Sequence, residues 1–363
     1  MSVKAALLAT LLAAASAGLA QAQERVVNIY NWSDYIDPAI LEAFTKETGI
    51  KTVYDVYDSN EILENKMLTG GSGYDIVVPT ADFMARQIAA GVYQPLDKAK
   101  LPNLSNMWDE IMKRAAQYDP GNKYAVPYMW GTDGIGYNVK KVNEILGEGK
   151  RPGLEVIFDP AVAAKFKDCG IYVFDSPRDV MGAALHYLGL SPESKSPDDL
   201  AKVEALLTAT RPNIRKFHSS EYISALANGD ICIAMGYSGD MLQARNRAAE
   251  ANAGVEVDYS IPSQGAQVWI DSMVIPKDAP HVEEAHIFLN YMMRPDVAAK
   301  ASEYVFYANA NKASQAVMSK EVLEDPAVYP DAELFAKLYT VTAWDAKTQR
   351  LATRIWTKVI TGQ

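Results

Sequence analysis

The regular alternation of strand and helix patterns in the first third of the chain is the feature that most constrains its fold. Three predicted strands cover residues 26–30, 51–57 and 74–79, and the last of them is continuously apolar. A helical pattern separates each pair of strands and begins at a typical capping residue, Asp37 or Ser59. Strands separated by helices pair in parallel. The sequence therefore predicts an α/β fold with parallel strands.

A second unit of the same character follows Gly136. Its predicted strands are 171–174, 231–236, 255–261 and 268–275, and its predicted helices include 198–208, 282–293 and 295–302. So long a chain exceeds what one hydrophobic core usually supports. We therefore expect two lobes, formed by residues 23–133 with 256–303 and by residues 134–255 with 304–363. A ligand cleft is expected where the strands end at their carboxyl edge.

The N-terminus has the pattern of a secretory signal. Lys4 precedes an apolar run over residues 5–15, and small residues follow up to Ala22. The apolar run is about half of the ~20 residues that cross a bilayer, which disfavours the alternative of a permanent anchor. We expect cleavage after Ala22 and a soluble mature protein in the periplasm.

Charge favours a cationic partner over nucleic acid. The chain has 35 basic and 45 acidic residues, a formal charge of −10, and it loses one base, Lys4, with the leader. An acidic protein repels nucleic acid and attracts cations, although acidity also serves solubility alone. Charge by itself therefore does not identify the ligand.

The chain has two cysteines, Cys169 and Cys232. In an oxidising compartment such a pair is more often bridged than free, so a structural disulfide is expected, with two buried thiols as the alternative. A redox role is disfavoured because the sequence has no Cys-x-x-Cys motif.

Aromatic and acidic side chains follow most of the predicted strands. These strand exits are Asn31-Trp32-Ser33-Asp34-Tyr35, Thr80, residues 175–179, Tyr237-Ser238-Gly239-Asp240 and Trp269-Ile270-Asp271. A ligand with ammonium groups joined by methylenes requires this mixture, because carboxylates pair with the charged ends and aromatic faces cover the chain.

Each of these residues also has a purely structural interpretation. Trp32 could cover the edge of the core, and Asp34 or Asp240 could cap a helix. Asp271 is harder to explain by packing, because it lies two residues after Trp269 on the same face of a strand.

Other functional classes leave few traces in the sequence. Paired carboxylates near aromatic residues also occur in exported carbohydrate-active enzymes, so that class remains an alternative. A binding protein for another small ligand is also possible, but there is no Tyr-Tyr pair for ferric ion. The sequence contains no nucleophile elbow, Walker loop or dinucleotide fingerprint. We expect no cofactor and no metal, since the histidines form no ligand pair: His186, His218, His281 and His286.

Across the whole mature chain the sequence resembles the periplasmic polyamine-binding proteins of ABC transporters. The strings that carry the resemblance are IYNWSDYI, YDSNEILE, YDIVVP, MWGTDGIGYN, RPNIRKFHSS, LANGDICIAMGYSGD and YANANK. The resemblance implies a type II periplasmic binding protein, with two lobes, mixed and mostly parallel sheets and a central ligand cleft. It also implies a monomer that closes on a polyamine and delivers it to a permease in the inner membrane. Hinge strands are expected near residues 132–136 and 254–257.

The resemblance also assigns ligand contacts. It implies that Asp34, Asp240 and Asp271 approach ammonium groups. The other implied contacts are Trp32, Ser33, Tyr35, Thr80, Asp179, Ser219, Tyr237, Trp269 and Tyr307. The two cysteines match positions that are bridged in the family.

The choice between putrescine and spermidine depends on a few positions. Trp269 and Asp179 resemble the spermidine type, Ser33 resembles the putrescine type, and Tyr237 and Thr80 depart from the putrescine pattern. The sequence thus leans slightly to spermidine and does not separate the two ligands.

Overall fold

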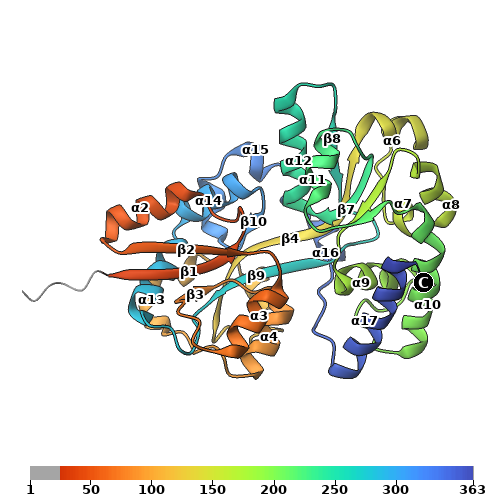
Figure 1. Cartoon of the computed structure of the whole chain (residues 1–363). Coiled ribbons are helices and arrows are strands. Elements are labelled where there is room, and N and C mark those ends of the chain that lie inside the picture. The colour runs from red at the N-terminus through yellow and green to blue at the C-terminus, as the bar shows by residue number, and fades with distance from the viewer. Residues whose placement is uncertain (1–24, 363) are drawn as a thin grey trace, which may run out of the picture.

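The computed structural model describes residues 25–362, and the predicted signal segment lies outside this range. Figure 1 shows two groups of helices and strands joined by long central strands. The strands are β1 Val26–Trp32, β2 Lys51–Tyr57, β3 Ile76–Val77, β4 Ala125–Asn138, β5 Ile171–Val173, β6 Lys216–Phe217, β7 Ile233–Tyr237, β8 Val257–Ser260, β9 Val268–Val274 and β10 Ala308–Asn309.

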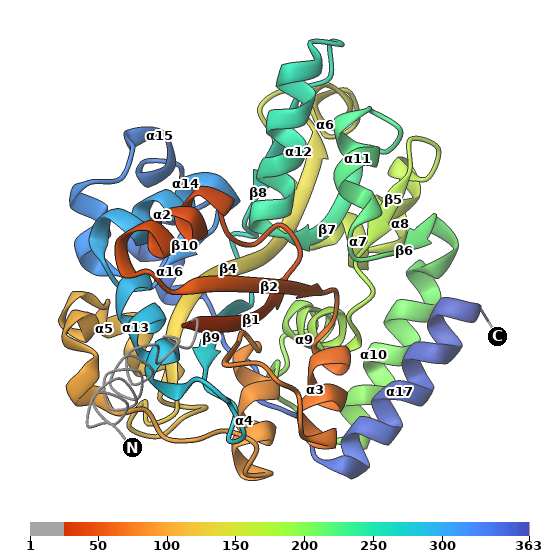
Figure 2. The same ribbon diagram turned by 60° about the vertical axis from the view of Figure 1, so that its left-hand side comes forward.

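Helices surround these strands in both groups (Figure 2). They are α2 Pro38–Thr48, α3 Asn60–Thr69, α4 Ala81–Ala89, α5 Asp109–Ala115, α6 Val139–Leu146, α7 Glu155–Phe158, α8 Pro160–Ala163, α9 Pro177–Tyr187, α10 Pro197–Thr210, α11 Glu221–Ala227, α12 Ser238–Ala251, α13 Val282–Met292, α14 Pro295–Val305, α15 Lys320–Leu323, α16 Ala332–Lys337 and α17 Ala346–Thr361. Among residues 25–362, no helix has the length and apolar character needed to cross a membrane.

The predicted alternation at the N-terminus is confirmed. β1 pairs in parallel with both β2 and β3. The side chains of Asp37 and Ser59 cap the intervening helices α2 and α3, each by accepting a backbone N–H bond, as their sequence positions predict. β5 likewise pairs in parallel with β6 and β7. The mixed α/β architecture is therefore as expected.

β4 is the central strand, and it joins the two groups. Its first part pairs antiparallel with β9, and its last residues pair antiparallel with β7 and β8. All fourteen of its residues are buried. Sequence analysis expected a crossing strand only at residues 132–136, so most of β4 was missed.

Strand pairing also bears on where the two groups meet. β8 pairs with the last residues of β4, on the edge opposite β7, although residues 256–303 were expected in the first lobe. β10 pairs with Met129 and Trp130, in the part of β4 that faces the first group, although residues 304–363 were expected in the second lobe. β8 ends at Ser260 and β9 begins at Val268, so residues 261–267 join a strand at the end of β4 to a strand at its beginning. The expected hinge at residues 254–257 stays a prediction. The division into two moving lobes stays a prediction.

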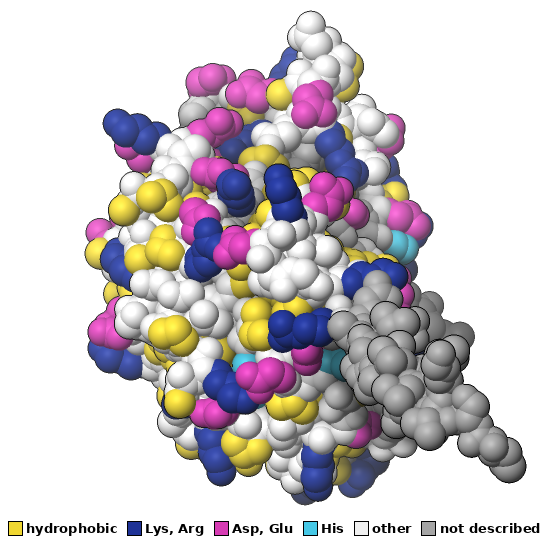
Figure 3. Space-filling view, turned by 90° about the vertical axis from the view of Figure 1, so that its left-hand side faces the viewer, with side chains coloured by type: hydrophobic (Ala, Val, Ile, Leu, Met, Phe, Trp, Pro, Cys, Tyr) yellow, Lys and Arg dark blue, Asp and Glu magenta, His cyan; other side chains and the backbone are white. Residues whose placement is uncertain are grey.

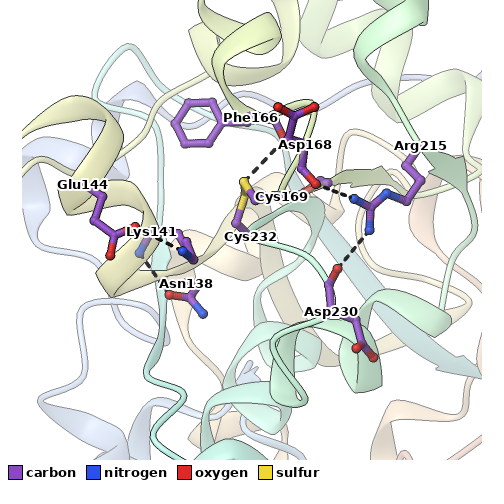
Figure 4. Close-up of a disulfide and its surroundings, with 10 residues drawn as sticks. Asn138, Lys141, Glu144, Phe166, Asp168, Cys169, Arg215, Asp230 and Cys232 are labelled. Atoms are coloured by element: carbon purple, nitrogen blue, oxygen red, sulfur yellow. Dashed lines mark hydrogen bonds and ion pairs between the residues drawn. A yellow bond between two sulfur atoms is a disulfide. The ribbon is translucent and has the colours of Figure 1, made fainter.

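The disulfide between Cys169 and Cys232 is present, which confirms that expectation. Figure 4 shows it beside the backbone that leads into β5 and β7. The bridge closes a sequence separation of 63 residues. Next to it, the guanidinium of Arg215 donates hydrogen bonds to the carbonyl oxygens of Asp168 and Asp230 at 2.9 Å each. Two segments far apart in sequence are thus fixed at the start of neighbouring parallel strands.

Candidate functional site

Asp271 lies at the centre of the candidate site. Strand alternation places it on the same face of β9 as Trp269 and Gln267. The side chain is 5% exposed, and the hydroxyl of Tyr35 donates to its Oδ2 at 2.9 Å. Its Oδ1 atom has no hydrogen-bond partner in the described part of the chain. Burial raises the pKa of Asp271 to about 7, against the opposing hydrogen bonds from Thr80 and Tyr35.

Asp240 supplies a second carboxylate from the first turn of α12. The hydroxyl of Tyr222 donates to its Oδ2 at 2.6 Å, and that of Tyr307 donates to its Oδ1 at 3.0 Å. Burial raises the pKa of Asp240 to about 6, although both hydrogen bonds favour the ionised form. α12 begins at Ser238, two residues before Asp240. A capping side chain accepts hydrogen bonds from backbone N–H groups, whereas Asp240 accepts them from two tyrosine hydroxyls. The helix-cap interpretation of Asp240 is therefore wrong.

Asp179 supplies the third carboxylate, from the first turn of α9. Its oxygens accept hydrogen bonds from Ser176 at 2.6 Å, from the amide of Gln267 and from Tyr237 at 3.4 Å. Burial raises its pKa, while these hydrogen bonds and the neighbouring Arg178 act in the opposite direction. We name Asp179, Asp240 and Asp271 the carboxylate cluster.

Aromatic rings stand between these carboxylates. Trp269 lies near the middle, with its ring centroid 5.9 Å from that of Tyr237 and 5.0 Å from that of Tyr307, both nearly edge-on. Tyr35 lies 5.7 Å from Tyr307. Gly131 of β4 permits this packing, because a Cβ atom there would come within 2.4 Å of the Trp269 ring. The indole nitrogen of Trp269 has no partner within residues 25–362.

The other predicted contacts from the first strand exit form hydrogen bonds within the protein or are exposed. The indole of Trp32 donates to the carbonyl oxygen of Val78 at 2.9 Å. Ser33 is exposed and donates to Asp58 at 2.8 Å. Asp34 is exposed with a left-handed φ of 52°, and it does not cap α2, since Asp37 does. Its negative charge nevertheless acts on Asp240.

Two predicted polar contacts also have partners within the protein. Ser219 accepts a hydrogen bond from the backbone N–H of Asp175 at 3.1 Å. Thr80 forms an isolated antiparallel β-bridge with Asp271. Its hydroxyl oxygen accepts a hydrogen bond from the side-chain amide of Asn60 at 2.9 Å. Thr80 thus lies at the carboxylate cluster, and Ser219 lies beside a neighbouring strand exit.

Several residues of the site were missed by sequence analysis. Ser176, Tyr222 and Gln267 hold the carboxylates in place through the hydrogen bonds described above. Asp133 of β4 is buried at the same place, with neither carboxylate oxygen bonded to any described residue. A signal for Asp133 exists in the sequence, since it is the single charged residue in the run MWGTDGIGYN.

The buried carboxylates of this site fit a positively charged organic ligand. No lysine or arginine forms an ion pair with the carboxylate cluster in the described residues. The nearby Arg178 instead donates to the carbonyl oxygens of Thr342 and Pro192. Within residues 25–362, no three His, Cys, Asp or Glu side chains are grouped as metal ligands. Buried carboxylates without a cation are costly, which makes a positively charged organic ligand the natural partner.

The surface gives no comparable signal. On the face shown in Figure 3, acidic and basic side chains are interspersed and hydrophobic ones are scattered. Ion pairs such as Arg294–Glu47 and Arg25–Glu284 balance charges at the surface. The argument for a cationic ligand thus depends on the buried carboxylates and not on net charge.

Comparison with known proteins is consistent with this site. Residues 39–330 match the family model described as bacterial extracellular solute-binding protein. The chain is 51% identical over 359 residues to the putrescine-binding periplasmic protein PotF of Escherichia coli (strain K12), covering 98% of this chain and 97% of that relative. It is 50% identical to the putrescine-binding periplasmic protein SpuD of Pseudomonas aeruginosa (strain UCBPP-PA14), covering 98% of each.

Solved structures agree with the fold. The substrate-binding protein PotD of a spermidine/putrescine ABC transporter from Streptococcus pneumoniae superposes with a TM-score of 0.80. Its sequence is 31% identical, and the match covers 93% of this chain and 99% of that chain. The relatives compared here are binding proteins of transporters and not enzymes, which argues against the carbohydrate-active alternative.

Proposed function

The chain belongs to the family of bacterial extracellular solute-binding proteins, and we propose that it captures a linear aliphatic polyamine in the periplasm. The observation that carries this proposal is the carboxylate cluster, which is buried among aromatic rings and has no basic partner in the described chain. The two bacterial relatives are putrescine-binding periplasmic proteins, which supports the same ligand class and compartment. Delivery to an ABC permease in the inner membrane, by a monomer, completes the proposal.

The chemistry of capture follows from the geometry. Ammonium groups donate charge-assisted hydrogen bonds to Asp271 and Asp240, whose carboxylates are already oriented by tyrosine hydroxyls. The faces of Trp269 and Tyr237 cover the methylenes and attract the cations, at about 0.5 to 2 kcal/mol for each cation–π contact. The first strand exit adds Trp32, Ser33, Asp34 and Tyr35, and the other proposed contacts are Thr80, Asp179, Ser219 and Tyr307.

Closure of the lobes accounts for how binding is communicated. Asp271 comes from β9 beside the first group of elements, whereas Asp240 and Asp179 begin helices of the second group. One ligand that pairs with carboxylates of both groups stabilises the closed arrangement over the open one. The permease can then distinguish the closed, ligand-bound protein from the open, ligand-free one.

Titration calorimetry of the mature chain tests the proposal. Putrescine, cadaverine, spermidine and spermine are titrated into residues 23–363, and saturable binding of at least one of them is expected. An oligosaccharide and an amino acid serve as control ligands. Turnover of the oligosaccharide, or the absence of heat with all four amines, would contradict the proposal.

The aromatic wall predicts a change in selectivity. Trp269→Phe should shift the ratio of putrescine affinity to spermidine affinity by roughly three- to tenfold, because the smaller ring covers less of a long ligand and gives a weaker cation–π contact. Trp108→Phe is the control, since Trp108 packs on Phe335 away from the carboxylate cluster. Competition binding measures both ratios, and an unchanged ratio in Trp269→Phe removes that residue as the selector.

Polyamine affinity is expected to depend on pH. Burial raises the pKa of Asp271 to about 7 and that of Asp240 to about 6, and an ammonium ion pairs with the ionised forms. Below these values, binding must first remove a proton from each group, so affinity falls as the pH is lowered. Between about pH 7.5 and pH 5.5 the loss should be roughly 30- to 100-fold. Calorimetry over this range checks it, and a constant affinity would show that these carboxylates do not hold the ligand.

A further inference from the structure

Asp133 is a buried carboxylate that the proposed capture of a diamine leaves without a partner. Its side chain is 3% exposed, and neither oxygen accepts a hydrogen bond from any residue between 25 and 362. Burial raises the pKa of Asp133 well above its usual range, and the negative charge of Asp179 raises it further. If the group is ionised it lacks a cation, and if it is protonated its hydroxyl lacks an acceptor. The protein alone satisfies neither state.

β4 places Asp133 on the same face as the ligand site. Residues two apart on a strand share a face, so Asp133 follows Gly131, across which the Trp269 ring lies. In the antiparallel pairing with β7, Asp133 lies directly opposite Tyr237, and side chains of such a pair point to one side. The Tyr237 hydroxyl in turn donates to Asp179. Asp133 and Asp179 are therefore both neighbours of Tyr237, whose pKa is raised by burial and further by the negative charge of each.

The backbone at Asp133 lies next to the residue that precedes β9, four positions before Asp271. The N–H of Asp133 donates to the carbonyl oxygen of Gln267 at 3.1 Å, so the two backbones are adjacent. Gln267 directly precedes β9 and is four residues from Asp271. In extended chain, this separates their Cα atoms by about 13 Å. The two nitrogens of a four-carbon diamine are separated by about half of that length. A triamine has a further nitrogen beyond its second carbon segment.

We propose that Asp133 and Asp179 form a second cation position, which holds the additional ammonium group of a triamine such as spermidine. This proposal rests on polyamine binding as the function. Asp179 is already oriented by Ser176 and Gln267, and Asp133 has both oxygens free for the same cation. Two neighbouring carboxylates repel one another unless a positive group pairs with them, which favours ligands that carry a third charge.

Asp133→Asn in the full mature chain tests the second cation position. The substitution keeps the shape of the side chain and removes its charge. Spermidine affinity should fall at least tenfold, while putrescine affinity changes less than about threefold. Calorimetry with both amines gives the two values. Asp119→Asn is the matched control, since Asp119 is also buried with one unpartnered oxygen but bonds the backbone of Tyr124 and Ala125, and it should leave the ratio unchanged.

The outcomes separate this proposal from the function on which it rests. Equal losses for both amines, or no loss for either, would overturn the second cation position, because Asp133 would then be structural or hydrated. A native chain that binds putrescine and not spermidine would overturn it while leaving polyamine capture intact. A chain that binds neither amine would remove both proposals.

A measurement on the unaltered chain does not require that a variant folds. Calorimetry at about pH 7 in buffers of different ionisation enthalpy counts the protons released on binding. Spermidine should release more protons than putrescine, because Asp133 must become ionised to pair with the third ammonium group. Equal proton release for the two amines would overturn the proposal.

Discussion

Asp271→Asn is expected to weaken polyamine binding by about 3 to 5 kcal/mol, which is more than about 100-fold in Kd. The substitution removes the charge that faces an ammonium group at a position where water is excluded. The hydrogen bond from Tyr35 holds this carboxylate in place, and its unpartnered Oδ1 is the atom left for the ligand. Calorimetry above pH 7.5, where Asp271 is ionised in the native chain, gives the full effect.

Ser272→Ala is the matched control for this substitution. Ser272 is the next residue on β9, is fully buried and points to the opposite face, and its hydroxyl has no partner in residues 25–362. It should leave affinity unchanged. If Asp271→Asn binds putrescine within about twofold of the native chain while remaining folded, the assignment of Asp271 to an ammonium group is wrong.

Replacing both Cys169 and Cys232 by serine should lower the free energy of unfolding by about 4 kcal/mol. The bridge closes a sequence separation of 63 residues, and cross-linking a loop of this length reduces the entropy of the unfolded chain by that amount. Urea unfolding followed by circular dichroism measures the loss. Reduction of the native chain with a thiol is the control, and it should give the same shift.

Ligand affinity should survive this change. The bridge lies at the start of β5 and β7, whereas Tyr237 is the last residue of β7 and Asp240 follows it. The double variant at 25 °C should therefore bind polyamine as the native chain does. A loss of stability below about 1 kcal/mol would mean that the two segments are fixed by the core and not by the bridge.

The sequence predicted the elements whose signals are local. Asp37 and Ser59 were recognised as helix starts because a capping residue carries its own hydrogen bond to the helix, and both cap in the structure. The third strand of the N-terminal unit was found because a buried parallel strand is a continuous apolar run. Asp240 was found because it follows β7, and Asp271 because it lies two residues after Trp269 on one face of β9.

β4 was missed for a physical reason. Its run contains Pro127 and three glycines, which usually indicate a turn. It is a strand because β9, β7, β8 and β10 pair with it, and these partners come from distant parts of the sequence. Gly131 and Gly134 are needed because a Cβ atom would collide with Trp269 or Tyr259. Tertiary packing overrides local propensity here.

The details of the site depended on side-chain partners that spacing does not reveal. The hydroxyls of Tyr222 and Tyr307 meet at Asp240 although about 85 residues separate them along the chain. Asp133 was overlooked because residues 132–136 were considered only as a hinge and not as part of the ligand site. Trp32 was expected against the ligand on the basis of resemblance and stays a prediction; its indole N–H donates to the carbonyl oxygen of Val78.

The most direct test of the account is a crystal structure of the mature chain with spermidine. We expect one terminal nitrogen of the ligand at about 2.7 to 3.2 Å from Oδ1 of Asp271, another nitrogen at Asp240 and the methylenes against Trp269. Ligand density outside the carboxylate cluster, or a bound amine whose nitrogens contact neither Asp271 nor Asp240, would contradict the account.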